Sequence, residues 1–314
     1  MEHLIFAVNI VFPLFIMILL GYLLTVFKLW NASFTSAANK VCFKVFFPIL
    51  LFNNIYQTNI KELFDGKLIL FTLVSILLSI LFSLLVIMLL VREDAKKGVI
   101  IQTIFRSNFI LFGMGIAGNI YGPQGVGVTA TLVALVVPVF NLSAVVILAL
   151  FNQENQKNLL FIFKDIIKNP LIIGSIVGMV VSSLQITFPS AVQKSLNDLS
   201  GIATPLALLI LGGEFGFKGL KKNIQYIFMG TIGRLIIVPL FALTAAVLLG
   251  FRDYKLVALL AAFASPTAVS AYIMAAEAGA DSELAGQLVV ITTFLSPLTL
   301  CLFIYAFKSM GLIL

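Results

Sequence analysis

Arg106, Ser107 and Asn108 form a polar triplet inside a long apolar stretch of the sequence. Two glycines, Gly113 and Gly115, follow it, and glycine loosens a helix and lets other groups approach its backbone. An arginine, a hydroxyl and an amide in apolar surroundings could bind a strongly polar or negatively charged solute, since ionisable residues inside a membrane are usually functional. The first expectation is therefore a substrate-binding site around this triplet.

A second polar interruption, Ser265-Pro266-Thr267 with Ser270 shortly after it, lies in the stretch AAFASPTAVSAYIM. Pro266 removes a backbone donor and clashes with the preceding turn, so a helix must kink or open there. In hydrocarbon an unpaired N–H or C=O is costly, so such a break persists only where protein or a water-filled cavity satisfies it. Two breaks at matching depth predict a shared polar cavity near the midplane, faced by the positive N-terminal ends of half-helices.

Both interruptions have alternative interpretations. A purely structural kink is the alternative for Pro266, although its pairing with Asn108 and Arg106 favours a functional site. Arg106 lies about nine residues beyond Lys97, so its side chain could extend back to the cytoplasmic interface. Its functional alternative is a counter-charge for a substrate carboxylate, and the sequence leaves both open.

Two further ionisable residues, Glu214 and Arg234, are candidate coupling groups or charge partners. Glu214 stands close to Lys218, which favours an interfacial salt bridge over a proton or cation site. Arg234 lies about 12 residues past Lys222, deep enough to require a partner that the sequence does not name.

Small residues at helical spacing indicate close helix packing rather than substrate contact. They are Ser75, Ser79, Ser83 and the GxxxG pair Gly174 and Gly178. Glu277 and Asp281, which follow the second interruption, are expected to form a solvated rim.

The elements that must hold these residues are membrane-spanning helices. The chain has 314 residues, of which 61% are hydrophobic and 11% charged, and its mean hydropathy is +1.13, far above that of a water-soluble domain. Ten apolar runs approach the roughly 20 residues that cross about 30 Å of hydrocarbon. Their expected bounds are 4–27, 36–57, 68–91, 97–120, 125–151, 166–186, 191–215, 224–250, 254–277 and 283–308. We therefore expect an all-α polytopic membrane protein.

Composition and motifs disfavour other classes of protein. The single histidine, His3, and the cysteines Cys42 and Cys301 offer no metal-binding cluster and no imidazole base inside the membrane. The net charge of +7 is spread over short loops, which is typical of membrane topology rather than nucleic-acid binding. The spans contain no GxSxG, HExxH or paired-aspartate motif, so an enzyme or receptor is disfavoured and no cofactor is expected.

Basic residues favour one orientation, because cytoplasmic loops carry an excess of Lys and Arg. The loops after odd-numbered spans contain Lys28, Arg92, Lys96, Lys97, Lys157, Lys164, Lys168, Lys218, Lys221 and Lys222. The opposite side has Lys61, Lys67, Lys194, Arg252, Lys255 and Lys308. The larger set is expected in the cytoplasm together with a linker at 152–165, so both termini are expected outside a plasma membrane.

An internal repeat divides the chain into residues 1–151, the linker 152–165 and residues 166–314. Five pairs align in order at offsets of 157 to 159: Pro13 with Pro170, Gly21 with Gly178, Pro48 with Pro205, Ser107 with Ser265, and Pro138 with Pro297. Each part has five spans, an odd number, so the two must enter the membrane from opposite sides. The sequence predicts a five-plus-five inverted repeat in which spans 4 and 9 are equivalent and broken.

The motifs of spans 4, 9 and 10 resemble the auxin efflux carrier family, which includes bacterial malonate and malate permeases. NFILFGMG has Asn108 and Gly113 of the family pattern Asn-x4-Gly-x-Pro, with Gly115 in place of the proline. PTAVSAYIMAAEAGADSELAGQLVVITTFLS is a close match from Pro266 to Ser296. The likeness covers essentially the whole chain, and the glycine at 115 is expected to leave one kink less rigid than in the family.

This resemblance implies a scaffold of spans 1, 2, 6 and 7 and a transport unit of spans 3–5 and 8–10, whose broken spans 4 and 9 cross at the substrate site. It also implies an elevator-type movement and a homodimer. The expected function is secondary transport of a small organic anion across a lipid bilayer, with H⁺ or Na⁺ as open choices of coupling ion. The alternatives are a sodium-coupled symporter of the bile-acid-carrier type and a channel.

Overall fold

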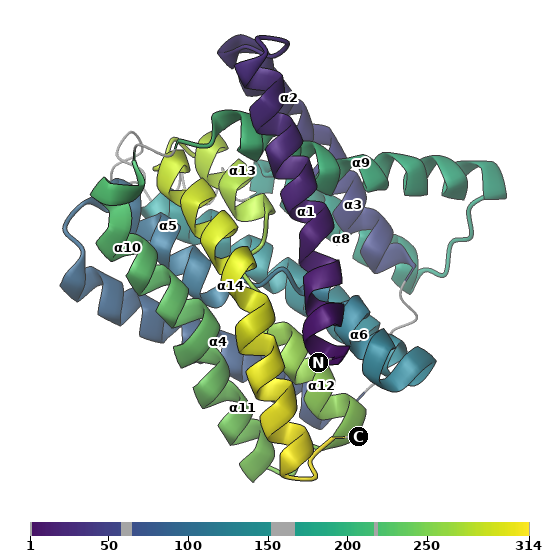
Figure 1. Cartoon of the computed structure of the whole chain (residues 1–314). Helices are drawn as coiled ribbons and strands as arrows, with labels where there is room; N and C mark the ends of the chain where they lie inside the picture. The colour runs from purple at the N-terminus through teal and green to yellow at the C-terminus, as the bar shows by residue number, and fades with distance from the viewer. Residues whose placement is uncertain (1, 58–64, 152–166, 217–218, 314) are drawn as a thin grey trace.

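The computed structural model describes residues 2–57, 65–151, 167–216 and 219–313, and in these ranges the regular structure is helical (Figure 1). The helices are α1 (Glu2–Val26), α2 (Ala32–Val41), α3 (Phe47–Tyr56), α4 (Gly66–Leu90), α5 (Asp94–Phe105), α6 (Phe109–Leu150), α8 (Pro170–Ser183), α9 (Ser190–Glu214), α10 (Leu220–Ile232), α11 (Val238–Leu248), α12 (Asp253–Ala264), α13 (Ser270–Glu277) and α14 (Ser282–Ser309). π-helical turns at Cys42–Phe46 and Gly233–Ile237 join α2 to α3 and α10 to α11. The predicted linker 152–165 lies outside the described residues.

Six of the described helical stretches are long and apolar enough to cross a membrane. They are Ala32–Tyr56, Gly66–Leu90, Phe109–Leu150, Ser190–Glu214, Leu220–Leu248 and Ser282–Ser309, and two shorter apolar helices cover Val11–Val26 and Pro170–Ser183. The predicted all-helical polytopic class is confirmed in this coarser form, while ten separate spans and the inverted repeat stay predictions. Helices α5, α12 and α13 have only 12, 12 and 8 residues, so none of them could cross the hydrocarbon alone.

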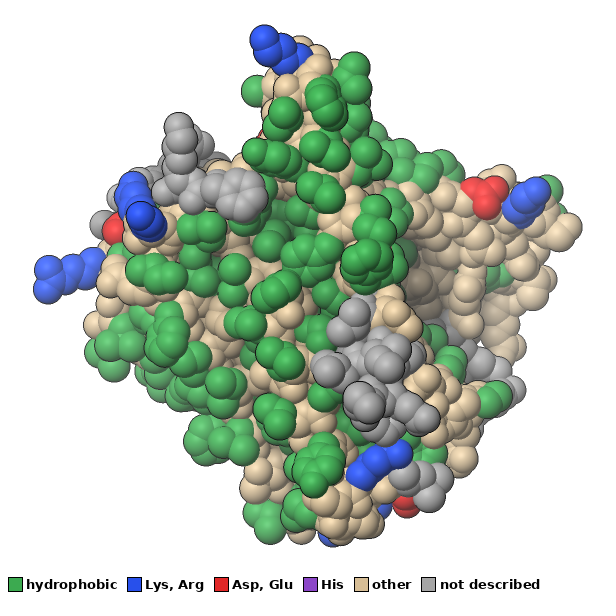
Figure 2. Space-filling view, viewed as in Figure 1, with side chains coloured by type: hydrophobic (Ala, Val, Ile, Leu, Met, Phe, Trp, Pro, Cys, Tyr) green, Lys and Arg blue, Asp and Glu red, His purple; other side chains and the backbone are tan. Residues whose placement is uncertain are grey.

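Large apolar side chains cover the surface that lipid would contact. Leu77, Leu85, Phe241 and Leu302 are examples of such exposed side chains. Hydrophobic side chains cover much of the visible face, while Lys and Arg lie near its margins (Figure 2). An apolar surface bordered by charge suits a helix bundle surrounded by a bilayer.

Helices α1, α3, α8 and α9 pack against one another, and glycines allow their closest crossing. A Cβ atom added at Gly21 of α1 would lie 2.0 Å from the carbonyl oxygen of Leu209, and one added at Gly212 of α9 would lie 1.9 Å from that of Ile18. Because no side chain fits in such a gap, the crossing of α1 and α9 requires glycine on both helices.

The two glycines that the sequence assigned to helix packing, Gly174 and Gly178, are found in that role. A Cβ atom added at Gly174 of α8 would lie 2.6 Å from the carbonyl oxygen of Pro48, and one added at Gly178 would lie 3.0 Å from that of Phe52, both in α3. In α4, the hydroxyls of Ser79 and Ser83 donate to carbonyl groups of their own helix. The prediction of close helix packing is confirmed for Gly174 and Gly178, and for the serines of α4 it stays a prediction.

The other helices form a second packed group. Helix α12 lies along α6, α11 along α12, and α10 along α14. Within α6, Gly122 has φ 58° and ψ −143°, a conformation that suits glycine, so the chain changes direction between helical segments 109–121 and 123–150. This turn separates the stretches that the sequence predicted as spans 4 and 5.

Candidate functional site

Two helix breaks lie side by side in the middle of the structure. One separates α5, which ends at Phe105, from α6, which begins at Phe109; the other separates α12, which ends at Ala264, from α13, which begins at Ser270. The two breaks pair as an isolated antiparallel β-bridge between residues 107 and 267. Both breaks therefore occur where the sequence placed its two polar interruptions.

Hydrogen bonds across the breaks satisfy the backbone groups that the helices release. The backbone N–H of Asn108 donates to the carbonyl oxygen of Pro266 at 2.7 Å. The hydroxyl of Thr267 donates to the carbonyl oxygen of Arg106 at 3.2 Å, and its backbone N–H donates to Oγ1 of Thr292 at 3.3 Å. Since an unpaired backbone group in a membrane is costly, this pairing is what makes the two breaks mutually dependent.

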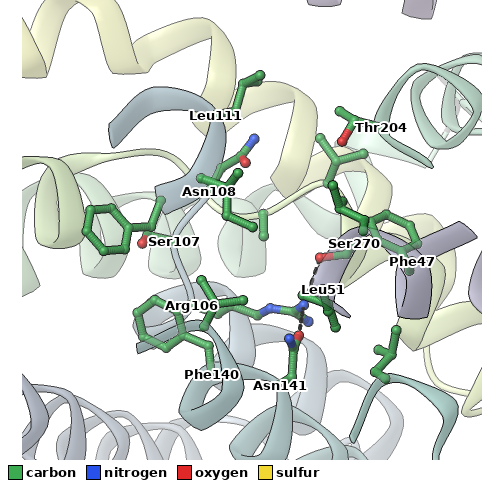
Figure 3. A pocket seen from close by; sticks show the side chains of 17 residues that line it. Phe47, Leu51, Arg106, Ser107, Asn108, Leu111, Phe140, Asn141, Thr204 and Ser270 are labelled. Atoms are coloured by element: carbon green, nitrogen blue, oxygen red, sulfur yellow. Dashed lines mark hydrogen bonds between the residues drawn. The ribbon is translucent and has the colours of Figure 1, made fainter. Parts of the chain in front are cut away.

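A cavity of about 80 Å³ adjoins the breaks (Figure 3). One part of its wall comes from the first turns of α6 and α13, which include Asn108 and Ser270. The facing wall comes from α3, α8 and α9, through side chains such as Leu51, Leu171 and Thr204. The cavity thus lies where the two packed groups of helices meet.

Arg106 brings a positive charge into this cavity. Its side chain is 4% exposed, and its guanidinium donates to Oδ1 of Asn141 at 2.5 Å and to Oγ of Ser270 at 2.7 Å. Figure 3 shows the guanidinium between these two partners. Extension of Arg106 toward the interface is not observed, and no Asp or Glu occurs among the described residues that line the cavity. The charge therefore lacks a carboxylate partner there.

Three buried polar atoms beside Arg106 have no hydrogen-bond partner within the described part of the chain. They are Oγ of Ser107, Nδ2 of Asn108 and Nδ2 of Asn141. Buried polar atoms are nearly always paired, so a group of unpaired ones at a cavity indicates a place for a polar ligand. All three can donate a hydrogen bond.

The backbone at the cavity also contributes hydrogen-bond donors and partial positive charge. Helices α6 and α13 both begin at the cavity, and the first N–H groups of a helix have no partner inside it. Each helix N-terminus is equivalent to roughly half a positive charge. The guanidinium, the side-chain donors and the two helix starts together make a site suited to an anion.

Only some of the predicted substrate-binding residues line the cavity. Arg106, Ser107, Asn108 and Ser270 do so. The remaining predicted residues, Gly113, Gly115, Ser265, Pro266 and Thr267, are absent from its wall.

The residues absent from the wall have structural positions nearby. Ser265, Pro266 and Thr267 build the break itself, and α6 continues as a helix through Gly115. The less rigid kink expected from glycine at 115 is not observed as a break, because the chain opens before α6 and turns again only at Gly122. Gly113 packs instead against the ring of Phe109.

The two candidate coupling residues lie outside the cavity wall. Glu214, at the end of α9, accepts a hydrogen bond of 2.5 Å from the hydroxyl of Tyr272, while its predicted partner Lys218 is outside the described residues. Arg234 is 0% exposed and donates only to backbone carbonyl groups at the ends of α5 and α12. Glu277 is more than a solvated rim, since it accepts a hydrogen bond from Asn39 at 2.8 Å.

Asn141 is the site residue that the sequence analysis missed. It stands in VVPVFNLSAVV, three positions after Pro138, and is 1% exposed. A lone amide in an apolar span was a usable signal, since polar residues in a membrane usually face a cavity or a partner.

The described residues contain no group of three His, Cys, Asp or Glu side chains placed to hold a metal ion.

Comparison with known proteins finds similarity to membrane transport proteins. A family model described as membrane transport protein matches residues 6–304. The chain is 24% identical over 310 residues to an uncharacterized transporter of Methanocaldococcus jannaschii, covering 94% of this chain and 96% of that protein. It is 22% identical to an uncharacterized transporter of Methanothermobacter thermautotrophicus, covering 92% and 95%. It is also 27% identical to a proposed malonate transporter of Rhizobium meliloti, over 45% of this chain and 44% of that protein.

Proposed function

Because this chain belongs to the membrane transport protein family, the auxin efflux carrier family that its motifs resemble, we propose that it is a secondary active carrier for a small organic anion. Family membership makes the chain a membrane transport protein. The substrate class, the site and the mechanism are the content of the proposal.

The proposal rests on the uncompensated charge of Arg106. Its guanidinium is buried at the cavity, held by Asn141 and Ser270, and accompanied by the unpaired donors of Ser107 and Asn108. A buried cation without a carboxylate partner is costly, and a bound carboxylate would remove that cost through charge-assisted hydrogen bonds. An anion therefore fits this site better than a cation or a neutral solute.

The size of the cavity favours a ligand of few atoms. A volume of about 80 Å³ lies far below the 300–1,000 Å³ or so of pockets that bind drug-sized molecules. A mono- or dicarboxylate such as malate or malonate suits this size. The partial likeness to the proposed malonate transporter supports malonate as the first compound to test.

We propose an elevator-type mechanism on ten spans arranged as two inverted repeats. The packing of α1, α3, α8 and α9 supports their role as a scaffold, and that of α4–α6 with α10–α14 supports a transport unit. The cavity lies between the two groups, where a movement of one against the other would alternate its exposure. A plasma-membrane location, outside termini, a cytoplasmic linker at 152–165 and a homodimer complete the proposal.

Uptake of radiolabelled malonate into proteoliposomes tests the function, with Arg106→Gln as the informative variant. Glutamine keeps hydrogen-bonding capacity and removes the charge, so we expect malonate affinity to fall by about 10- to 100-fold. Arg92→Gln, which removes an exposed loop arginine, is the control and should transport normally. Substrate-driven counterflow identifies a carrier rather than a channel. Equal malonate transport by the native protein and Arg106→Gln would contradict the proposed site.

A further inference from the structure

Arg234 is an entirely buried arginine with no ion pair among the described residues. It lies in the π-helical turn Gly233–Ile237 between α10 and α11 and is 0% exposed. The three ion pairs found in the described ranges involve other residues. A buried guanidinium of this kind must be satisfied by other means, because an unpaired charge in the membrane is costly.

Backbone carbonyl groups satisfy every donor of Arg234. Nε donates to Ser265 at 2.9 Å, Nη1 to Ile104 and Phe105 at 3.1 Å each, and Nη2 to Ala262 at 3.3 Å and to Phe263. A guanidinium has five N–H groups, so these five contacts use all of them. The carbonyl groups come from two helices that the sequence separates by more than one hundred residues.

These carbonyl groups are the C-terminal ends of the two half-helices. Ile104 and Phe105 close α5, and Ala262, Phe263 and Ser265 close α12. Each helix C-terminus has unsatisfied carbonyl groups and is equivalent to roughly half a negative charge. The two ends together are therefore equivalent to roughly one negative charge, and the positive charge of the guanidinium balances it.

In transporters with broken helices, carbonyl groups at half-helix C-termini are typical ligands for coupling Na⁺ ions. Here the corresponding oxygens are already engaged by Arg234. We infer that Arg234 is a built-in cation that takes the place of a coupling metal ion between α5 and α12, so that the anion site assembles without Na⁺. The inference extends the proposed function. Its tests by malonate binding rest on that function, whereas its tests by unfolding temperature do not.

Arg234 is accordingly a positioning residue for the anion cavity. It fixes the C-terminal ends of α5 and α12, and the chain continues from these ends through the two breaks to the starts of α6 and α13. Arg106 lies at the breaks on the cavity side, within hydrogen-bond distance of Ser270. One arginine thus faces the ligand, while the other holds together the two chain segments that present it.

The native protein provides the first test, through replacement of sodium chloride by choline chloride at equal ionic strength. We expect the thermal unfolding temperature to be unchanged and the dissociation constant for malonate to stay within about twofold. A requirement for Na⁺ in either measurement would overturn the inference. The unfolding temperature needs no anion, so it tests the built-in cation even if malonate fails to bind and the proposed substrate class is wrong.

The second test removes the guanidinium group of Arg234 by substitution and then adds free guanidinium ion to the solution. Arg234→Ala should lower the unfolding temperature by about 5 °C or more, and guanidinium chloride at a few millimolar should restore part of this loss. Arg252→Ala is the matched control, because Arg252 also donates to backbone carbonyl groups but is exposed. It should show a smaller loss and no recovery with guanidinium. A native unfolding temperature for Arg234→Ala, or a loss that guanidinium does not restore, would contradict the inference.

Arg234→Lys keeps the test decisive if Arg234→Ala does not fold. An ammonium group has three donors instead of five, so it should hold the two helix ends less firmly. We expect a folded protein with an intermediate unfolding temperature and about three- to tenfold weaker malonate binding. Native values for both quantities would show that the five-donor fork of the guanidinium does not position the site, since lysine retains the positive charge.

Discussion

The backbone N–H of Asn108 donates to the carbonyl oxygen of Pro266 at 2.7 Å, which joins two helix breaks that lie far apart in the sequence. Proline interrupts its own helix because it has no N–H. The carbonyl group of Pro266 lies in this interruption, outside α12 and α13, and accepts a hydrogen bond from the other break. The starts of α6 and α13 are therefore held at a fixed separation across the cavity. A change in either break should be measurable as a change in ligand binding.

Replacement of Asn108 should weaken anion binding, and a replacement that introduces negative charge should weaken it more than a neutral one. Asn108→Ala removes the unpaired Nδ2 donor, and we expect malonate affinity to fall by about 3- to 10-fold. Asn108→Asp places a carboxylate against the anion and should reduce affinity by more than about 100-fold. Isothermal titration calorimetry measures both. Thr231→Ala, which removes another buried unpaired oxygen away from this cavity, is the control, and equal binding by all variants would exclude Asn108 from the site.

The contact between Tyr272 of α13 and Glu214 of α9 should stabilise the observed arrangement of the two helix groups. The hydroxyl of Tyr272 donates to the carboxylate at 2.5 Å, and we expect a coupling energy of about 1–2 kcal/mol in a double-mutant cycle of Tyr272→Phe with Glu214→Gln. Thermal unfolding of the four proteins gives this energy. The same cycle with Glu283→Gln should be additive, and additivity in the Glu214 cycle would show that the hydrogen bond contributes nothing.

Alanine at Gly212 should disrupt the crossing of α1 and α9. The added Cβ atom would lie 1.9 Å from the carbonyl oxygen of Ile18, so the helices must separate, at a cost of about 1–3 kcal/mol or more. Gly201→Ala in the same helix is the control, because nothing lies within 4 Å of its added Cβ atom. It should be neutral or stabilise by up to about 1 kcal/mol, since alanine favours a helix. Similar unfolding temperatures for the two variants would argue against a close crossing.

The ion pair between Asp65 and Lys255 should make a small, pH-dependent contribution to stability. The two side chains approach to 2.6 Å, and the hydrogen bond from Lys255 lowers the pKa of Asp65 below its ordinary value of 3.8. A lowered pKa in the folded state means that the contribution is fully present above about pH 4 and is lost as the pH falls through the lower, folded value. Because the pair is partly exposed, it should amount to no more than about 1 kcal/mol.

Asp65→Asn isolates this pair in a measurement of unfolding temperature from pH 3 to pH 7. Asparagine retains the cap that Asp65 provides to the backbone N–H of Leu68. The difference between the native protein and Asp65→Asn should therefore shrink as the pH falls. A difference that is constant over this range would mean that the ion pair is not its cause.

The sequence predicted the features that depend on local chemistry. Apolar length identified the membrane class, and the polar triplet at 106–108 and Pro266 gave the positions of both helix breaks. Gly174 and Gly178 were correctly assigned to helix packing. Hydrophobic length, the missing N–H of proline and the absent side chain of glycine act within one segment, so a single chain reveals them.

The tertiary structure decided which of these segments meet. It placed Asn141 beside Arg106, left Gly113 and Gly115 away from the cavity, and gave Arg234 the carbonyl groups of two helix ends as partners. Arg234 and Ile104 are separated by 130 positions along the chain. Their contact depends on how several helices pack together, and helix packing in a membrane is set by shape and by buried hydrogen bonds that periodicity does not encode.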